Sequence, residues 1–536
     1  MKKIIIITLV LISSLLILVS CNDEVKHKDL FNNVPLTIEF PDDGRELTDA
    51  KIIFGNADFV TIYYTKNGDT NLKLVKNSEI TDINAGDTIS LYADRANVLN
   101  HDYLKIDCTE YCYVYGNVMS LIKKTGFEDV TAVFEDAFRE LFKDNKHIKS
   151  HFSNPIVLGG TDLGARCYQK MFSGCSGLTD MSNMVIAADV MSTEACLGMF
   201  EECTSLTKAP ELPATVMAES CYKEMFFNCS RLVDGPSKLP ADKMKESSCR
   251  SMFRNCSSLV SAPVLKAKEV AESCYAYMFE NCENLTTAMD VLPATTLYKE
   301  CYYGMFLNCK ELGNAPHILA TTLAPRCCKN MFAGCISLTT VQDELYAEKL
   351  TVDCYNAMFK DCKSLTTAPY LPAETTANDC YGLMFSGCSS LTTFQDCLPA
   401  LKMEDYCYSH MFEDCSSLTK APDIPATEVG YSSCNAMFMG CTKITESPVL
   451  YSEQLQTLCY NDMFKGCSSL TDITCLAKEF SPQNNDTSDM AIGAVETGVL
   501  YVADGMVDNW SQRVSSITIL PAGWTIQVYQ PEQPEE

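Results

Sequence analysis

Basic residues and tryptophan are scarce in this chain, and each scarcity narrows what the protein can do. Its 536 residues include 42 Lys and Arg against 69 Asp and Glu, which gives a formal net charge of −27 without any Lys/Arg-rich run. Nucleic-acid binding needs clustered Lys and Arg to displace counterions from the phosphate backbone, so nucleic acid is not expected as a partner. The two tryptophans, Trp510 and Trp524, both lie near the C-terminus, so the rest of the chain lacks the strongest sugar-stacking side chain.

Motifs for metal binding and catalysis are missing as well. The chain has 30 Cys but no Cys-x-x-Cys, and the isolated pair Cys108 and Cys112 has no matching second pair. A structural zinc site needs four such ligands, so this pair is expected to join a strand to a turn, with or without a disulfide. The six His share no repeat phase, and no phosphate-binding loop, paired-acid motif or EF-hand loop occurs. Neither an enzyme activity, nor a cofactor, nor a bound metal is expected.

The N-terminus has the pattern of an export signal. Lys2 and Lys3 precede an apolar run over residues 4–19, which ends in Leu18-Val19-Ser20-Cys21. The order of charge, apolar run, small residue and Cys resembles the lipobox of bacterial lipoproteins, and it implies cleavage before Cys21 and a lipid on its thiol. The alternative is an uncleaved anchor helix. Both place the chain outside the cytoplasm, and the first predicts an exported lipoprotein at the outer membrane or cell surface.

An internal repeat dominates the rest of the sequence. Met-Phe pairs recur over 292 residues in eleven intervals, or about 26.5 residues each, which is the range of leucine-rich repeats. A Cys lies three or four residues before each Met and another lies four residues after it. A divergent thirteenth copy around Leu141-Phe142 precedes them. The Met residues of the twelve pairs are 171, 199, 225, 252, 278, 305, 331, 358, 384, 411, 437 and 463.

Each repeat unit divides into two pieces with different predicted structures. Cys, Met and Cys at i, i+4 and i+8, as in Cys221 to Cys229, predict one buried stripe of a helix. Leu-Thr-Thr-Ala-Pro, as in Leu365 to Pro369, predicts a short strand. Strands stack about 4.8 Å apart but helices need about 8–10 Å, so the stack should curve. The predicted fold is therefore an α/β solenoid, a curved stack of about 13 leucine-rich-repeat units.

The repeat has a second, longer period of 53 residues. Units of 26 residues mostly carry Pro eleven residues after Met, and alternate with units of 27, several of which carry Asx at the next position. These Asx residues predict either a row of carboxylates for a cation or a basic partner, or turns that accommodate the extra residue. The candidate binding residues of this row are Asn183, Asp290, Asp343 and Asp396.

Tyrosine and cysteine form further regular positions. Tyr follows the first Cys of most units, and this could be an aromatic band for glycans or proteins, or partial packing between units with the hydroxyl in water. The candidate residues are Tyr222, Tyr275, Tyr302, Tyr355, Tyr381 and Tyr408. The 24 repeat cysteines are predicted to be buried, reduced thiols, because two Cys eight residues apart on a helix are too far apart for a disulfide.

The flanks differ in texture from the repeats. Period-two alternation with turn signals predicts a small Ig-like β-sandwich over residues 34–115. Strands around Val499-Leu500-Tyr501-Val502 and Trp524 to Val528 are expected to cover the last repeat. The predicted divisions are 1–20 signal peptide, 21–33 tether, 34–115 β-sandwich, 116–158 N-terminal cap and divergent first repeat, 159–480 leucine-rich repeats, and 481–536 C-terminal cap and tail.

The unit Cys-Tyr-x-x-Met-Phe-x-x-Cys-Ser-Ser-Leu-Thr-x-Ala-Pro-x-Leu-Pro-Ala resembles the BspA-like class of bacterial surface leucine-rich repeats. The best copies are Cys380 to Ala400 and Cys407 to Ala426. The resemblance implies a non-catalytic surface protein that binds or adheres to extracellular protein or glycan partners, held to the membrane by the lipid on Cys21. The chain is expected to be a monomer. The alternative function is a structural or spacer component of the cell envelope.

Overall fold

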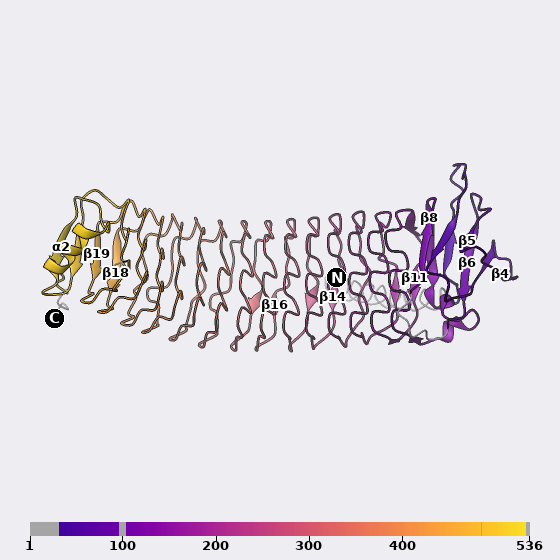
Figure 1. Ribbon diagram of the computed structural model, residues 1–536, viewed down its shortest axis with the longest axis horizontal. Helices are drawn as coiled ribbons and strands as arrows, with labels where there is room; N and C mark the ends of the chain where they lie inside the picture. Colours follow the sequence, from indigo (N-terminus) through magenta and orange to yellow (C-terminus); the bar gives the residue numbers. More distant parts are fainter. Residues whose placement is uncertain (1–31, 96–102, 484, 532–536) are drawn as a thin grey trace, which may run out of the picture. The chain divides into compact units, whose positions relative to one another are not determined.

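The protein is described by a computed structural model that covers residues 32–95, 103–483 and 485–531. The chain divides into two compact units. The first unit comprises Met1–Val216 and Asn228–Leu239, and the second comprises Met217–Phe227 and Pro240–Glu536. The predicted signal peptide, its lipobox at Cys21 and most of the predicted tether lie outside the described residues. Figure 1 shows the coils of the second unit, each one repeat long, stacked side by side.

The first unit is built from short strands in two main sheets. An eight-stranded sheet has the order β13-β11-β8-β1-β6-β3-β4, with β10 also paired to β8, and a three-stranded sheet has the order β5-β2-β7. The strands up to the first coils are β1 (Thr37–Glu39), β2 (Ile52–Gly55), β3 (Ile62–Lys66), β4 (Lys73–Leu74), β5 (Glu79–Ile80), β6 (Thr88–Ala93), β7 (Lys105–Cys108) and β8 (Cys112–Asn117). After these come η1 (Val118–Leu121), η2 (Phe127–Asp129), β9 (Ala132–Val133), β10 (Ile148–Ser150), β11 (Ile156–Leu158), β12 (Asp162–Leu163), β13 (Val185–Ile186) and β14 (Lys238–Leu239). The period-two alternation thus correctly indicated strands, while an Ig-like sandwich stays a prediction.

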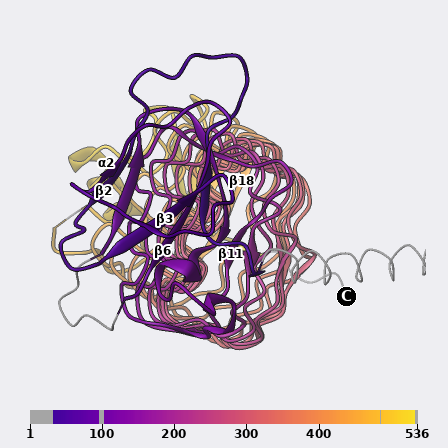
Figure 2. The same cartoon turned by 90° about the vertical axis from the view of Figure 1, so that its right-hand side faces the viewer.

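Strand β8 joins the N-terminal sheet to the first coils. On one side it pairs antiparallel with β1, and on the other it pairs in parallel with β10 and β11, which belong to the coils. Figure 2 looks onto the end of this unit at which β2, β3 and β6 lie. The region predicted as a separate domain therefore shares one hydrogen-bonded sheet with the beginning of the repeats.

The Met-Phe segment is not a helix, so the α/β prediction is wrong in its helical part. Residues 166–480, all of which the structure describes, contain no α-helix. In all twelve units the residues five and one before Met, and three after it, have positive φ, and the non-glycine residues among them lie between 49° and 63°. A left-handed residue at every fourth position cannot belong to an α-helix, which needs φ near −60° throughout.

The backbone of this segment makes hydrogen bonds alternately within and between coils. In the unit of Met384, the amides of Tyr381, Leu383 and Phe385 donate to the next coil at 2.8–3.0 Å. The amides of Met384 and Ser386 instead donate to carbonyls three residues back in their own coil. Both sides of each coil are thus joined to the next at strand-like spacing. The spacing difference from which curvature was predicted is absent.

The other side of each coil carries short parallel strands, as predicted. The longer ones in the second unit are β15 (Val264–Leu265), β16 (Val291–Leu292), β17 (His317–Ile318), β18 (Glu446–Leu450) and β19 (Asp472–Cys475). Single bridges such as Thr367 to Thr393 continue the ladder where no longer strand forms. The core between the two sides consists of columns of buried side chains, and each Met-Phe unit contributes two Cys, one Met, one Phe and one Leu or Ile. Within each of the two compact units, the phenylalanines at the Met-Phe position of successive coils stack on one another, with ring centroids 5.3–5.8 Å apart.

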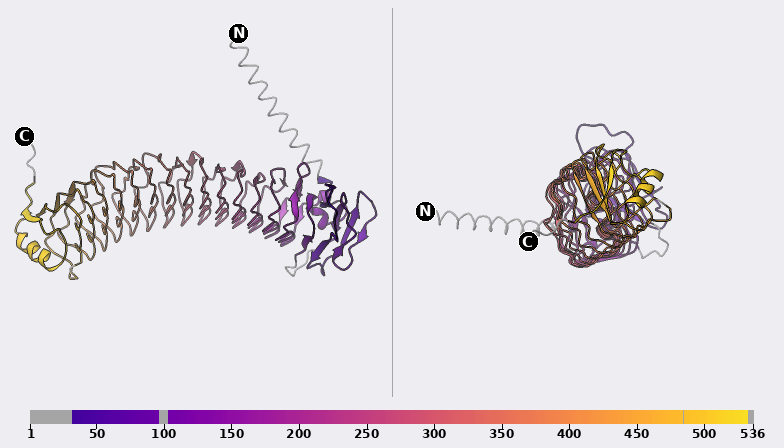
Figure 3. Two further views of the ribbon diagram at one scale, coloured as in Figure 1. Left: turned by 90° about the horizontal axis from the view of Figure 1, so that it is seen from above. Right: turned by 90° about the vertical axis from the view of Figure 1, so that its left-hand side faces the viewer.

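A C-terminal cap closes the ladder of the second unit. The predicted strands are present as β20 (Val499–Val502) and β21 (Thr525–Val528), and they extend the parallel sheet in the order β18-β19-β20-β21. Between them lies the unpredicted helix α2 (Val507–Ser516), seen at the C-terminal end of the second unit in Figure 3. Trp510 of α2 is fully buried, and its indole Nε1 donates to the carbonyl of Ala477 at 3.3 Å. In the described ranges, no helix has the length and apolar character that crossing a membrane requires.

Candidate functional site

The tyrosines predicted as a binding band are buried. All six candidates, from Tyr222 to Tyr408, are at most 2% exposed. They stack in the interior, as in the pair Tyr381 and Tyr408 with ring centroids 5.9 Å apart. The alternative of a hydroxyl in water is wrong too, since the Tyr408 and Tyr460 hydroxyls are buried without a hydrogen-bond partner among the described residues. The tyrosines are core residues of the stacked coils.

Three of the four Asx residues are exposed, and in two of the longer units the residue before Asx is a glutamine that bonds to the neighbouring coil. Asp290, Asp343 and Asp396 lie at the surface, and Asn183 is half-buried with its amide donating to the carbonyl of His151 at 3.2 Å. Beside Asp343, the buried Gln342 side chain accepts a hydrogen bond from Ile318 N at 2.6 Å. Beside Asp396, the Gln395 side chain accepts one from Leu371 N at 2.7 Å. These amides complete the ladder where the longer unit would interrupt it.

The cysteines are buried as predicted, although not on helices. Of the 29 described cysteines only Cys397 is exposed. The Cys four residues after each Met donates its thiol hydrogen to the carbonyl of a Phe in the preceding coil, as Cys388 does to Phe359 at 3.1 Å. Burial raises the pKa of the Cys388 thiol well above its ordinary value. That the thiols remain reduced stays a prediction. Among the described residues, no three His, Cys, Asp or Glu side chains form a group that could hold a metal ion.

Large apolar side chains that sequence reasoning missed form an exposed stripe on the strand side of the second unit. Seven coils each carry one, with exposed fractions from 38% to 63%. Each projects outward because side chains alternate along a strand, as where Leu398 and Ala400 point into the core and Leu401 points out. We call these residues the apolar stripe: Val264, Val291, Leu319, Tyr346, Tyr370, Leu401 and Tyr451.

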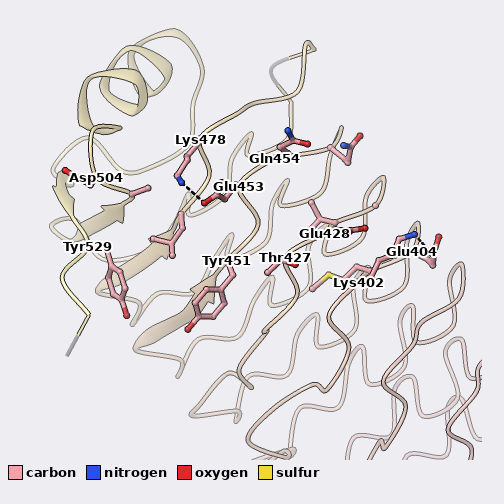
Figure 4. Close-up of a pocket in the computed structure, with 16 residues that line it drawn as sticks. Lys402, Glu404, Thr427, Glu428, Tyr451, Glu453, Gln454, Lys478, Asp504 and Tyr529 are labelled. Carbon is pink, nitrogen blue, oxygen red and sulfur yellow. Dashed lines mark hydrogen bonds and ion pairs between the residues drawn. The ribbon is translucent and has the colours of Figure 1, made fainter. Parts of the chain in front are cut away.

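At its C-terminal end the apolar stripe leads into a groove of about 980 Å³, the C-terminal groove. Its floor follows from the register of the cap sheet. Leu450, Cys475, Val502 and Val528 are partners in successive strands, so the residues after them, Tyr451, Leu476, Ala503 and Tyr529, form one outward column. Leu476 and Ala503 occupy the middle of this column, and the two tyrosines stand at its ends (Figure 4).

Charged side chains line the groove unequally. Lys402 and Lys478 are each held by a neighbouring carboxylate, at 3.2 Å from Glu404 and 2.5 Å from Glu453. The groove also contains Glu428 and Asp504, which are exposed and have no ion-pair partner among the described residues. With two lysines against four acidic residues, the lining carries a net charge of −2. A second, smaller hollow of about 420 Å³ lies on the same side of the coils around Tyr346 and Lys349.

A family model described as the BspA type leucine rich repeat region matches residues 166–313, 249–366, 319–422 and 355–484, which together span more than half of the chain. The chain belongs to this family. The twelve Met-Phe units of this BspA-type chain begin and end close to the limits of the match, so the family repeat and the stacked coils are the same feature.

Solved structures similar to this BspA-type chain include other leucine-rich-repeat proteins. A leucine-rich repeat protein from Bacteroides ovatus is 17% identical, with 64% of this chain and 88% of that chain covered and a TM-score of 0.32. A leucine rich cell surface protein from Faecalibacterium prausnitzii is 15% identical over 62% and 85%, with a TM-score of 0.26. The pneumococcal vaccine antigen PcpA is 12% identical over 82% and 97%, with a TM-score of 0.35. No curated protein matches.

A signal for the missed stripe is present in the sequence. Leu and Ala two positions apart, as in Leu371 and Ala373 or Leu398 and Ala400, mark inward positions in successive units. Given strand periodicity, the residues flanking them must face outward, and large apolar residues there stand out. The groove had no such signal, because it depends on how the cap strands β20 and β21 follow the last coils.

Proposed function

We propose that this chain is a lipid-anchored surface protein of a bacterium, which binds or adheres to extracellular protein or glycan partners without catalysis. The observation that carries the proposal is the apolar stripe. Single exposed apolar residues are ordinary on a protein surface, but seven coils of the second unit each expose one on the strand side, and Tyr451, the last of them, lines the groove.

Two further features support the proposal. The family is a class of bacterial surface repeat proteins, and the chain belongs to it over residues 166–484. The sequence before residue 22 resembles a lipobox with Cys21 as the lipid attachment site. Together they make an exported chain that exposes a long repeated face. Catalysis is not part of the proposed role.

Binding of the full chain in mild detergent to arrays of extracellular matrix proteins and glycans tests the proposal. The informative variant is Tyr346→Thr/Leu401→Thr, which makes two positions of the apolar stripe polar. Val260→Thr is the matched control, because Val260 is also exposed but lies in the column that carries Thr207, Thr286 and Thr392 in other coils. We expect the wild type and the control to bind one partner class and the stripe variant to lose most of the signal.

Equal loss in the control variant, or silence of the wild type on every array, would contradict the proposal. The alternative of an envelope spacer predicts that silence. It also predicts that external protease leaves the chain intact on whole cells, whereas a surface protein is cleaved under the same treatment.

A further inference from the structure

We propose that the C-terminal groove binds an extended, basic segment of a partner protein. The inference rests on the proposed function, since it specifies the chemistry of one site on a chain that acts by binding. Cavity, aromatic side chains and charge each contribute an independent argument.

The shape of the groove suits an extended chain. Its lining residues come from successive rungs of one ladder, from the rung of Lys402 through those of Glu428 and Gln454 to Ala503 and Tyr529. Five intervals at strand spacing amount to about 24 Å, which an extended segment of about seven residues spans. A globular epitope would contact the rims of such a groove and leave its floor empty.

The charges of the groove select the sign of the occupant. The two lysines are already paired with Glu404 and Glu453, so they offer little to an anion. Glu428 and Asp504 come from different rungs of the lining, and neither forms an ion pair among the described residues, although Lys402 lies on the rung beside Glu428. The formal charge of −27 on the whole chain adds a long-range field that attracts basic partners.

The tyrosines complete the match. Tyr451 and Tyr529 occupy the same column three rungs apart, about 14 Å at strand spacing. Guanidinium and ammonium groups bind the faces of such rings. The same cations also pair with carboxylates. Tyr451 is 44% exposed, so its ring is accessible to a ligand. A basic segment would place its cations on these rings and on Glu428 and Asp504, with its backbone over Leu476 and Ala503.

The test measures fluorescence anisotropy of labelled octapeptides with the full chain in mild detergent. One peptide alternates Arg and Ser, a second alternates Glu and Ser, and a third probe is a neutral oligosaccharide of similar length. The informative variant is Glu428→Gln/Asp504→Asn. Its matched control is Glu311→Gln/Asp242→Asn, which removes the same charge from exposed positions outside the groove lining and outside the Asx row.

The wild type should bind the Arg peptide and not the Glu peptide, with an affinity that falls as salt rises. The groove variant should bind the Arg peptide about tenfold more weakly, a change of about 1.4 kcal/mol, while the control variant stays within about twofold of the wild type. Equal weakening in both variants, or selective binding of the oligosaccharide, would overturn the inference.

The array experiment separates this outcome from the proposed function. A stripe-dependent partner on the arrays together with no Arg-peptide binding leaves the proposed function standing and removes the basic-segment inference. Silence in both experiments removes both. A Tyr529→Ala variant that keeps full affinity for the Arg peptide would also contradict the inferred position of the ligand.

Discussion

The backbone position three residues after Met is the most restricted position of the repeat. It is left-handed in every unit, and Asn, Asp or Gly occupy it in all but one. Consecutive asparagines bond to one another, as Asn308 does to Asn281 at 2.9 Å. Further along, Asp361, Gly387, Asp414 and Gly440 alternate. Neighbouring carboxylates one rung apart would repel each other, and the glycine between them gives each carboxylate room.

Gly387 is therefore expected to be intolerant of a side chain. A Cβ there would overlap the Asp361 carboxylate, and φ is +77°. Gly466 occupies the same position with the same φ but would make ordinary contacts only. We expect Gly466→Ala to lower the free energy of unfolding by about 1 kcal/mol and Gly387→Ala by about 2 kcal/mol. Urea unfolding measures both. In an Asp361→Gly background the two substitutions should cost the same, and a persistent difference would contradict the steric explanation.

Asp353 and Asp379 form a second residue-scale feature, a carboxylate pair on adjacent coils. Burial raises the pKa of Asp379 to about 6, and the charge of Asp353 adds to this effect. Asp353 keeps a pKa below its ordinary value in spite of burial, because Lys329 at 2.8 Å and Arg326 stabilise its charge. Asp379 therefore stabilises the fold below its ordinary pKa of 3.8, and this contribution is lost as pH rises through about 6.

At neutral pH the ionised Asp379 carboxylate is unfavourable in the folded state, and replacing Asp379 by Asn should remove this destabilisation. In the wild type, Asn356 Nδ2 donates to Asp379 Oδ1 at 2.8 Å. The substituted amide would keep an oxygen to accept this bond, and its NH₂ group could donate to Asp353. Because Asp379 is partly solvated, we expect a gain of about 1 kcal/mol at pH 7.5, with no gain at pH 4. Thermal unfolding at both pH values measures it, with the exposed Asp290→Asn as the charge control. A gain that does not depend on pH would contradict the assignment.

At the scale of elements, the Met-Phe segment explains how a helix was predicted where none exists. Inward residues recur every four positions, as Cys380, Met384 and Cys388 do. That spacing is close to the 3.6 residues of a helical turn, so the spacing of buried residues alone does not distinguish a helix from this coil segment. The buried pairs are the clearer sign, because Met and the Phe after it are both interior. The left-handed corners are maintained by amides that donate to the next coil.

The cysteine columns give a prediction for the same element. Thiols that are buried and bonded to carbonyls react slowly, because the thiolate is the reactive form and burial raises the thiol pKa. We expect a maleimide to label one thiol rapidly in the native protein, and Cys397→Ser to abolish that labelling. In the denatured, unreduced protein the 29 described cysteines should all react. A count near zero would show that the columns are oxidised.

At the scale of the whole molecule, the cap determines where the ladder ends. Beyond β19 the sheet continues through β20 and β21, and α2 is held by Trp510 and by the buried ion pair of Arg513 with Asp486. Without these strands the last coil would present unpaired amides and carbonyls, a template for association with another chain.

Deleting the C-terminal cap and tail, residues 481–536, should therefore produce assemblies larger than those of the wild type. Light scattering after size-exclusion chromatography measures the mass, and deletion of 532–536 alone serves as the control. The deletion also removes Ala503, Asp504 and Tyr529, so Arg-peptide binding should be lost in any fraction that does not assemble further. A deletion variant that stays folded and assembles no further than the wild type would show that the cap is not required to block the edge.

The sequence alone determined the repeat, its length, the solenoid and the buried columns, because a coil of 26 or 27 residues must bury the same positions in every copy. The tertiary structure decided the rest. Left-handed corners are stable only through amides that bond to the next coil, and the Tyr column became interior because neighbouring coils cover it. The C-terminal groove exists only where the cap strands follow the last coils. These outcomes depend on contacts between residues far apart in the chain, which local periodicity does not encode.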